Sequence, residues 1–341
     1  QSFMQDIANI YEKSLVPSPN LVADIATLEG DIMILGVGGK MGPGIARMAR
    51  QAADLAGVNK RIFGVARFSD PEIKKQLTSE GIETISADLL DDKSLQALPD
   101  AKNVLYLAGQ KFGTTGKESL TWAMNSYLPG RVAEKYRNSR IVVFSTGNVY
   151  PLSPVDRGGV AEESPIGPVG EYAQSCLGRE RLFQYFASKY NTPVFIYRLN
   201  YANDISYGVL LEIAKSVINE IPIDLSMGHV NVIWQGDANE MAIRALHHCS
   251  NPPKIVNITG PETVSVRWIA EEFGRTFSKT ARFIHNEQST ALLSNAAESF
   301  RLFGYPKVPL KRMMEMLAEW IRQGGKTLNK PTHFQEREGQ F

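Results

Sequence analysis

The 341 residues carry 37 lysines and arginines against 36 aspartates and glutamates, and 43% of them are hydrophobic. This balance is typical of a globular protein and excludes the strongly basic surface that draws proteins to nucleic acid or anionic membranes. No stretch is apolar over the length that spans a bilayer. We therefore expect a small-molecule substrate and no nucleic-acid or membrane partner.

Cysteines and histidines limit the chemistry further. Cys176 and Cys249 are too few for a disulfide framework and fit a reducing compartment. The five histidines do not combine with cysteines or carboxylates in the spacing of a metal site, so we expect no metal. The first residues lack the basic and apolar regions of a secretory signal, which predicts a cytoplasmic protein.

Residues 1–29 predict an N-terminal helical arm. Apolar positions indicate a helix over 4–15, and Pro17 and Pro19 indicate a connector after it. We expect this arm to be an appendage of the main fold.

From residue 30 onward, short apolar segments alternate with segments of helical periodicity. Strands are predicted over 31–36, 61–66, 83–87, 103–108, 140–145 and 194–199, and helices over 45–55, 71–80, 120–136 and 171–190. Nearly continuous apolar strands separated by helices predict a parallel sheet that is covered on both faces. The fold class is therefore α/β, with a Rossmann-type doubly wound domain over residues 30–200.

The pattern becomes less regular after Asn200. Helices are predicted over 208–219, 238–248, 266–277 and 310–323, and a strand over 254–258. We assign residues 201–341 mainly to a smaller substrate-binding portion. Its polar tail, from residue 326, is expected to be ordered by contact with a neighbour.

A glycine-rich turn joins the first strand to the first helix, with the sequence Gly36-Val-Gly38-Gly39-Lys-Met41-Gly42. Glycines let backbone NH groups approach a pyrophosphate at the positive end of a helix. In this strand–turn–helix setting the motif predicts dinucleotide binding. The alternative is a tight turn that serves packing alone.

Two residues after later strands bear on the cofactor. Arg67 follows the second strand, where NAD enzymes carry an acidic residue for the ribose hydroxyls, and a guanidinium there could pair with a 2′-phosphate. NADP is therefore favoured over NAD, with a solvated arginine as the alternative. Asp88, after the third strand, could accept a hydrogen bond from adenine or cap a turn.

These motifs, in this order, resemble the extended short-chain dehydrogenase/reductase family, also called the NAD-dependent epimerase/dehydratase family, over about residues 30–320. The marks of the resemblance are the glycine turn, Asp88-Leu89, Leu107-Ala108-Gly109, Asn125, Ser145-Thr146-Gly-Asn148-Val-Tyr150 and Tyr172-Ala-Gln-Ser. The resemblance implies that the cofactor contacts Gly36, Gly38, Gly39, Met41, Gly42, Arg67, Asp88, Leu89, Ala108, Gly109, Lys111, Asn125 and Tyr172.

The resemblance also implies roles in catalysis. Tyr172 would be the acid/base that exchanges a proton with a substrate oxygen, and Thr146 would polarise the same oxygen. Thr146, Asn148, Asn200 and Trp234 would contact the substrate. Gly147 and Asn148 stand where sugar-nucleotide dehydratases carry an acid pair, which argues against dehydration by that mechanism.

One position departs from the family. Cys176 stands four residues after Tyr172, where relatives carry a lysine that binds the nicotinamide ribose and favours tyrosinate. Lys111, in the loop after the fourth strand, is a candidate for part of the missing positive charge. Cys176 itself is either a small buried apolar residue or a nucleophile. The sequence shows no histidine or carboxylate partner that would activate it as a nucleophile.

The sequence therefore predicts an NAD(P)-dependent oxidoreductase or epimerase that acts on a hydroxyl or carbonyl group of a sugar or sugar derivative. The alternative is a dinucleotide-binding sensor or structural protein with little turnover, because Cys176 replaces the lysine. Aromatic residues in the helix after Tyr172 and the family's habit of pairing through it predict a homodimer.

Overall fold

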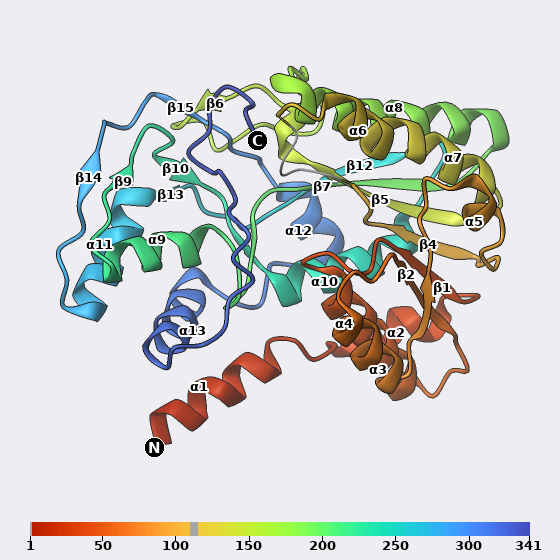
Figure 1. Ribbon diagram of the computed structural model, residues 1–341, viewed down its shortest axis with the longest axis horizontal. Coiled ribbons are helices and arrows are strands. Elements are labelled where there is room, and N and C mark those ends of the chain that lie inside the picture. The colour runs from red at the N-terminus through yellow and green to blue at the C-terminus, as the bar shows by residue number, and fades with distance from the viewer. Residues whose placement is uncertain (1, 110–114) are drawn as a thin grey trace.

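The computed structural model describes residues 2–109 and 115–341. Two parts lie side by side (Figure 1). One part holds a broad sheet between layers of helices, and the smaller part carries helices and short strand pairs. The N-terminus lies beside the smaller part, and the C-terminus lies between the two parts.

The large part is built on a seven-stranded sheet in the order β12-β7-β5-β4-β1-β2-β3. All of its neighbouring strands pair in parallel. The strands are β1 (Ile32–Leu35), β2 (Ile62–Ala66), β3 (Glu83–Ser86), β4 (Asn103–Tyr106), β5 (Arg140–Thr146), β7 (Val194–Leu199) and β12 (Lys254–Ile258). The predicted doubly wound α/β fold is confirmed.

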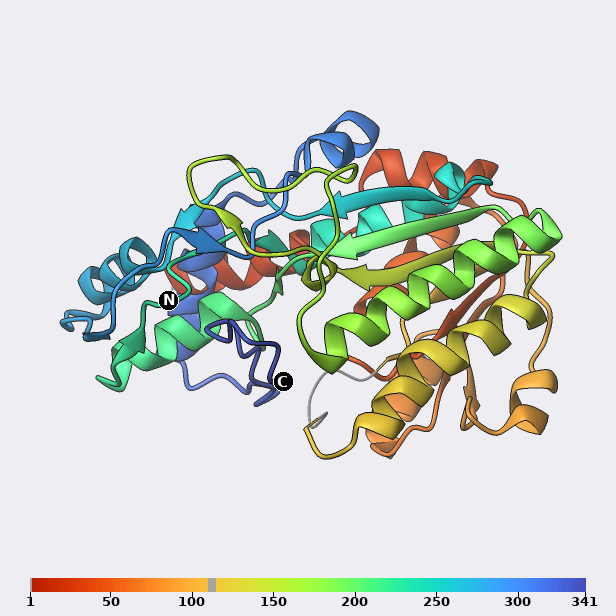
Figure 2. The same cartoon turned by 90° about the horizontal axis from the view of Figure 1, so that it is seen from above.

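Helices cover both faces of this sheet (Figure 2). Because side chains alternate along a strand, Ile32 and Ile34 pack on one face and Met33 and Leu35 on the other. The first face is covered by α2 (Pro19–Thr27), α3 (Gly42–Ala56) and α10 (Gln235–Arg244), and the second by α7 (Leu128–Lys135) and α8 (Gly170–Tyr190). Shorter helices complete the layers: α4 (Pro71–Ser79), α5 (Asp92–Gln96), α6 (Glu118–Trp122), η3 (Ala245–His248) and α12 (Ala297–Phe303).

The smaller part has its own apolar core, in which Leu210, Trp234, Phe273 and Leu317 are buried. Its helices are α1 (Ser2–Lys13), α9 (Val209–Ile218), α11 (Val266–Phe277) and α13 (Leu310–Arg322). Two-residue strands pair around them: β6 (Ser153–Pro154) with β15 (Thr290–Ala291), β8 (Ala202–Asn203) with β11 (Ile233–Trp234), β9 (Ile223–Asp224) with β14 (Phe283–Ile284), and β10 (His229–Val230) with β13 (Val264–Ser265).

The division at residue 200 differs from the observed arrangement. Strand β12 follows that point in the chain, yet it pairs with β7 at the edge of the main sheet. Helix α10 packs on the same sheet. The chain therefore leaves the large part after β7, returns to it for α10 and β12, leaves it again, and returns once more for α12.

The N-terminal arm is part of the core and not an appendage. Ser18 accepts a hydrogen bond from the backbone NH of Leu21 and so caps α2, which the sequence analysis missed. Leu21 and Ile25 are buried with α3 and α10 in the main core. Proline at the first position of α2 suits a helix start, because that position needs no NH donor.

The polar tail is ordered by contacts within the chain, where a neighbour was expected to order it. Thr332 donates from its backbone NH and its hydroxyl to Glu212 of α9, at 2.5 and 2.6 Å. Phe334 is buried in the core of the smaller part. Arg337 donates to the carbonyl oxygens of Ser226 and Thr290. The tail therefore lies along the smaller part and crosses toward α8.

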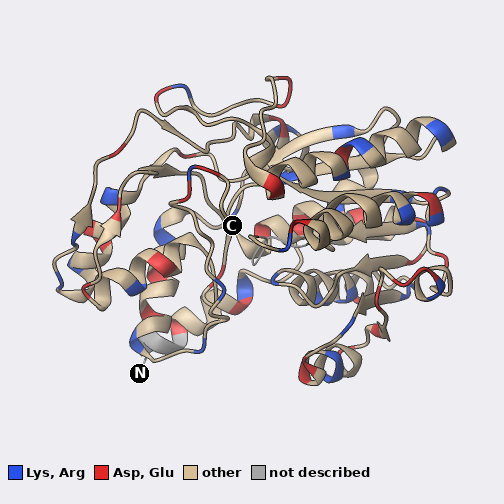
Figure 3. Ribbon diagram, turned by 45° about the horizontal axis from the view of Figure 1, so that its top comes forward, with Lys and Arg blue, Asp and Glu red and all other residues tan. Residues whose placement is uncertain are grey.

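Charged residues of both signs are interspersed over both parts (Figure 3). Within residues 2–109 and 115–341, no helix is both long and apolar enough to cross a bilayer.

The burial of α2 gives a test of the arm's role. Replacing Leu21 by alanine should lower the free energy of unfolding by roughly 2–5 kcal/mol, because it opens a cavity in the main core. Urea unfolding measures the change. Val16→Ala, at an exposed position of the same arm, serves as the control. Equal stability of the Leu21 variant and the parent would contradict the arm's place in the core.

Candidate active site

The glycine turn lies between β1 and α3. Gly36 has a φ of +89°, and a Cβ there would lie 2.6 Å from the backbone nitrogen of Ala108. At Gly42, a Cβ would lie 2.1 Å from the carbonyl oxygen of Val37. Both positions therefore require glycine. The turn brings backbone NH groups to the start of α3, which is the arrangement that binds a pyrophosphate.

A cavity of about 680 Å³ opens where β1, β4, β5 and β7 end. Ligands of open parallel sheets bind at this edge, and a cavity of this size accepts a small-molecule ligand. It is lined by Gly36, Gly39, Lys40, Met41, Gly42, Leu107, Gly109, Phe144, Ser145, Thr146, Asn148, Tyr172, Arg179, Leu199, Asn200, Tyr201, Ala202, Tyr207, Asn329, Lys330, Pro331 and Thr332.

Tyr172 and Thr146 meet in this cavity. Thr146 ends β5, and its hydroxyl accepts hydrogen bonds from the backbone and side-chain nitrogens of Asn148, both at 3.1 Å. Tyr172 lies in the first turn of α8, with its ring near Phe341. Burial raises the pKa of Tyr172 well above its ordinary value, and Cys176 adds to that rise. Arg179 and hydrogen bonding to Thr146 act in the opposite direction.

Cys176 is fully buried, and its side chain packs with Val149, Tyr150 and Tyr172. This environment suits a small apolar group. The described residues hold no cluster of three histidine, cysteine or carboxylate side chains that could bind a metal ion.

Arg179 is a site residue that the sequence analysis missed. It is only 6% exposed, and it lines the cavity together with Tyr172. Its Nη1 donates to the carbonyl oxygen of Phe144 at 2.8 Å, and its Nη2 donates to Oδ1 of Asn125 at 2.9 Å. Positions 172, 176 and 179 are spaced by four and three, so helical periodicity places them on one face. That spacing was the available signal.

Asn125 lies outside the cavity lining and acts on α8. It belongs to η1 (Ala123–Tyr127), a π-helical turn between α6 and α7 within the predicted helix over 120–136. Its Nδ2 donates to Oγ of Ser175, whose hydroxyl donates to the carbonyl oxygen of Tyr172. Asn125 therefore links the start of α8 to Arg179.

A buried ion pair lies behind the site. Arg198 of β7 donates to both carboxylate oxygens of Glu180, at 2.6 and 3.0 Å. Ser145 donates to the same carboxylate, and Arg198 also donates to the Tyr150 hydroxyl. Tyr150 in turn donates to Oδ1 of Asn257 in β12. This network joins α8 to three strands and to the turn after β5, η2 (Gly147–Val149).

Some residues predicted for the site lie outside the cavity lining: Gly38, Arg67, Asp88, Leu89, Ala108, Asn125 and Trp234. Arg67 is exposed at the end of β2. Asp88 accepts a hydrogen bond from the NH of Leu90 and thus closes a turn. Trp234 is in the core of the smaller part and donates to Ser14 of the arm, so the structure corrects its assignment to the substrate pocket. Lys111 lies outside the described residues.

Lys40 and the C-terminal tail also line the cavity, although neither was predicted from the sequence. Burial lowers the pKa of Lys40 to about 8, with a contribution from Lys330 that Glu212 opposes. Lys40 lies over the ring of Tyr207, whose buried hydroxyl has no hydrogen-bond partner among the described residues. The tail lines the same cavity through residues 329–332.

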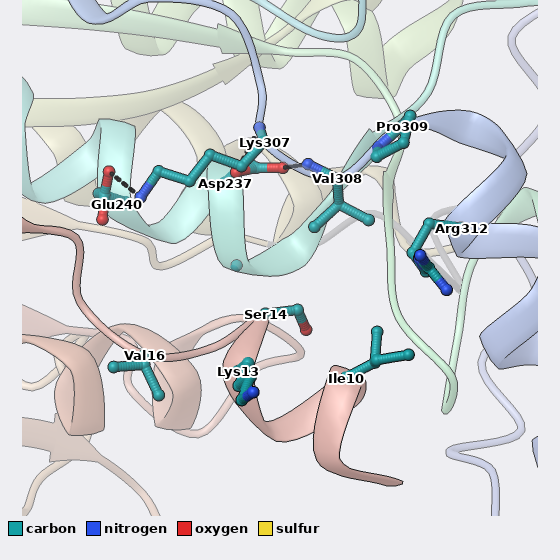
Figure 4. A pocket seen from close by; sticks show the side chains of 11 residues that line it. Ile10, Lys13, Ser14, Val16, Asp237, Glu240, Lys307, Val308, Pro309 and Arg312 are labelled. Carbon is teal, nitrogen blue, oxygen red and sulfur yellow. Dashed lines mark hydrogen bonds and ion pairs between the residues drawn. The ribbon is translucent and has the colours of Figure 1, made fainter. Parts of the chain in front are cut away.

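A second cavity, of about 370 Å³, lies between α1, α10 and the loop before α13 (Figure 4). Its acidic side chains already have partners. Asp237 accepts hydrogen bonds from the backbone NH groups of Lys307 and Val308, and Glu240 accepts from Ser18. These contacts hold the arm and the loop to α10, so we assign this cavity a structural role.

Comparison with solved structures identifies the same fold in sugar-nucleotide enzymes. UDP-glucose 4-epimerase of Thermus thermophilus, in complex with NAD, has 16% identity and a TM-score of 0.71, with 86% of this chain and 99% of that chain covered. The Thermotoga maritima UDP-glucose 4-epimerase with UDP-glucose has 14% identity, a TM-score of 0.71 and the same coverage. dTDP-glucose 4,6-dehydratase of Bacillus anthracis, in complex with NAD, has 15% identity and a TM-score of 0.72, covering 86% and 96%.

The search of curated proteins gave no match. The model of the NAD-dependent epimerase/dehydratase family matches residues 32–220, which is more than half of the chain. This match confirms the resemblance inferred from the glycine turn, Thr146 and Tyr172. The chain belongs to the NAD-dependent epimerase/dehydratase family.

Proposed function

We propose that the protein is an NAD(P)-dependent oxidoreductase or epimerase that acts on a hydroxyl or carbonyl group of a sugar or sugar derivative. The observation that carries the proposal is the meeting of Tyr172 and Thr146 in the cavity that begins at the glycine turn. Similar folds bind NAD in the Thermus epimerase and UDP-glucose in the Thermotoga epimerase, which supports a sugar as the substrate.

In this proposal, the dinucleotide supplies or accepts the hydride when it is bound. The glycine turn would hold its pyrophosphate through backbone NH groups. The turn requires glycine at positions 36 and 42, because a side chain at either would collide with the backbone. The Tyr172 hydroxyl gives a proton to the substrate oxygen or takes one from it. The Thr146 hydroxyl holds the same oxygen. Asn148 and Asn200 line the cavity and are proposed to contact the substrate.

A second candidate function is a dinucleotide-binding sensor without turnover. The full burial of Cys176 at the place of the family lysine favours it. The two functions differ in a direct measurement: the sensor binds NAD or NADP but produces no absorbance change at the nicotinamide band with any sugar or sugar-acid substrate.

The role of Tyr172 can be tested on the same helix. Tyr172→Phe should lower turnover by about 10²–10⁴-fold, because the variant lacks the proton that the substrate oxygen exchanges. Cofactor affinity, measured by fluorescence titration, should change little. Tyr185→Phe, at an exposed position of α8, is the matched control. Full turnover in the Tyr172 variant would refute its assignment as acid/base.

Arg67 is proposed to distinguish NADP from NAD. Its exposed position at the end of β2 leaves the guanidinium available to a 2′-phosphate. Arg67→Ala should weaken NADP binding by about tenfold or more and leave NAD binding unchanged, since a hydrogen bond to a charged group contributes about 1.5–3 kcal/mol. Calorimetric titration measures both affinities. Lys75→Ala, exposed on the neighbouring α4, controls for general loss of charge, and equal effects on both cofactors would exclude the role.

A homodimer through α7 and α8 is proposed as the assembly. Tyr127 and Tyr185 are largely exposed beside a groove that Gly130, Leu182 and Phe186 line. A double change of these tyrosines to glutamate should produce a monomer in sedimentation velocity experiments, because buried unpaired charges oppose association. Tyr305→Glu, exposed after α12, is the control. A monomeric parent protein would contradict the proposed assembly directly.

A further inference from the structure

Arg179 is a buried cation whose described hydrogen-bond acceptors carry no charge. Its two described acceptors, the Phe144 carbonyl and the Asn125 amide oxygen, are neutral, and its Nε has no hydrogen-bond partner among the described residues. It forms no ion pair with any described carboxylate. The nearest acid in sequence, Glu180, is engaged by Arg198 and Ser145.

The guanidinium lies toward the start of α8. Side chains on a helix point back toward its N-terminus. The contact with Asn125 fits this direction, because Asn125 also donates to Ser175, one turn before Arg179. Gly109 leaves room for the guanidinium: a Cβ at that position would lie 2.5 Å from Nη2. The charge is thus held beside the face that carries Cys176 and Tyr172.

Burying a charge that no ion pair compensates is unfavourable, because the charge loses its hydration. Such a residue is expected where an anion forms during function. In the proposed reaction that anion would arise at Tyr172: its O–H bond would break and a new O–H bond would form on the substrate oxygen, while the dinucleotide would supply the hydride to the substrate carbon, and the phenolate would remain. The oxidation direction reverses both transfers.

We propose that Arg179 is a positioning cation of this site, and that it stabilises the Tyr172 phenolate in place of the lysine whose position Cys176 occupies. The inference rests on the proposed function. The direction of the electrostatic effect agrees, because Arg179 lowers the pKa of Tyr172 against the larger effect of burial. Other titratable groups near the pair are Cys176 and Glu180 on α8 and Tyr106 on β4, and Lys40 and Lys330 line the same cavity.

Two substitutions of similar size separate charge from packing. Arg179→Gln removes the charge, whereas Arg179→Lys keeps it, and both lose the two-pronged contact with Phe144 and Asn125. The Gln variant should lose turnover about tenfold or more, and the pH limb of kcat/KM that belongs to Tyr172 should move upward by about 1–3 pH units. The Lys variant should keep most of the turnover and a pH profile close to that of the parent. Unfolding free energies of both variants identify any loss that comes from stability.

A rescue tests the replacement of the lysine directly. Cys176→Lys in the Arg179→Gln background returns a cation to the family position and should restore turnover and the pH profile. Equal impairment of the Gln and Lys variants, or a Gln variant with the parent's pH profile, would overturn the inference. Full turnover in Tyr172→Phe would instead defeat the proposed function, whatever the Arg179 variants do.

The inference can also be tested without substrate, in case the protein shows no turnover. The ring carbon resonance of ¹³C-labelled Tyr172, assigned by its loss in Tyr172→Phe, reports ionisation of the phenol. As the pH is raised, this resonance should begin to shift at a higher pH in Arg179→Gln than in Arg179→Lys. Identical titration of the two variants would also overturn the inference.

Discussion

The buried pair of Glu180 and Arg198 fixes the position on which the candidate site depends. The Glu180 carboxylate receives hydrogen bonds from Ser145 in β5 and Arg198 in β7, and Arg198 continues the network through Tyr150 to β12. Separating such a pair leaves each charge buried without compensation, which is strongly unfavourable. The two side chains are therefore held close together. Helix α8 is thereby held against the ends of the strands, and Tyr172 comes to lie beside Thr146. The two arginines of the region differ: Arg198 forms an ion pair with Glu180, whereas Arg179 donates to the neutral carbonyl of Phe144 and the amide oxygen of Asn125.

The sequence predicted those parts of the molecule whose signals are local. The continuous apolar sequences of strands such as β1 and β4 predict burial on both faces. The spacing of the glycines predicts a turn between a strand and a helix. Thr146 and Tyr172 follow from short motifs at the end of β5 and the start of α8. Helix α2 had a local signal as well, the Ser18 cap before Pro19, but two nearby prolines indicated a connector more strongly.

The remaining features depend on contacts between distant segments. Arg179 gains its environment from Asn125, 54 positions earlier in the chain, and from the strand carbonyl of Phe144. Trp234 is buried in the core of the smaller part, and its indole NH donates to the hydroxyl of Ser14 in the arm, 220 positions earlier in the chain. Such pairings leave no periodic trace in either segment. The tail is a similar case, since its polar composition does not reveal that Thr332 binds Glu212 or that Phe334 enters the core.

The return of the chain to the main sheet limits how its parts can be exchanged during evolution or by recombination. A single crossover at residue 200 would transfer α10 and β12 to the recipient together with the segments of the smaller part, although both pack on the donor's sheet. The hybrid would then join a foreign edge strand to β7 and a foreign partner to Tyr150 through Asn257. An exchange that leaves α10 and β12 with the recipient's sheet needs a crossover near residue 200, a second before α10 and a third after β12, so specificity is expected to diverge mainly by point changes within the cavity.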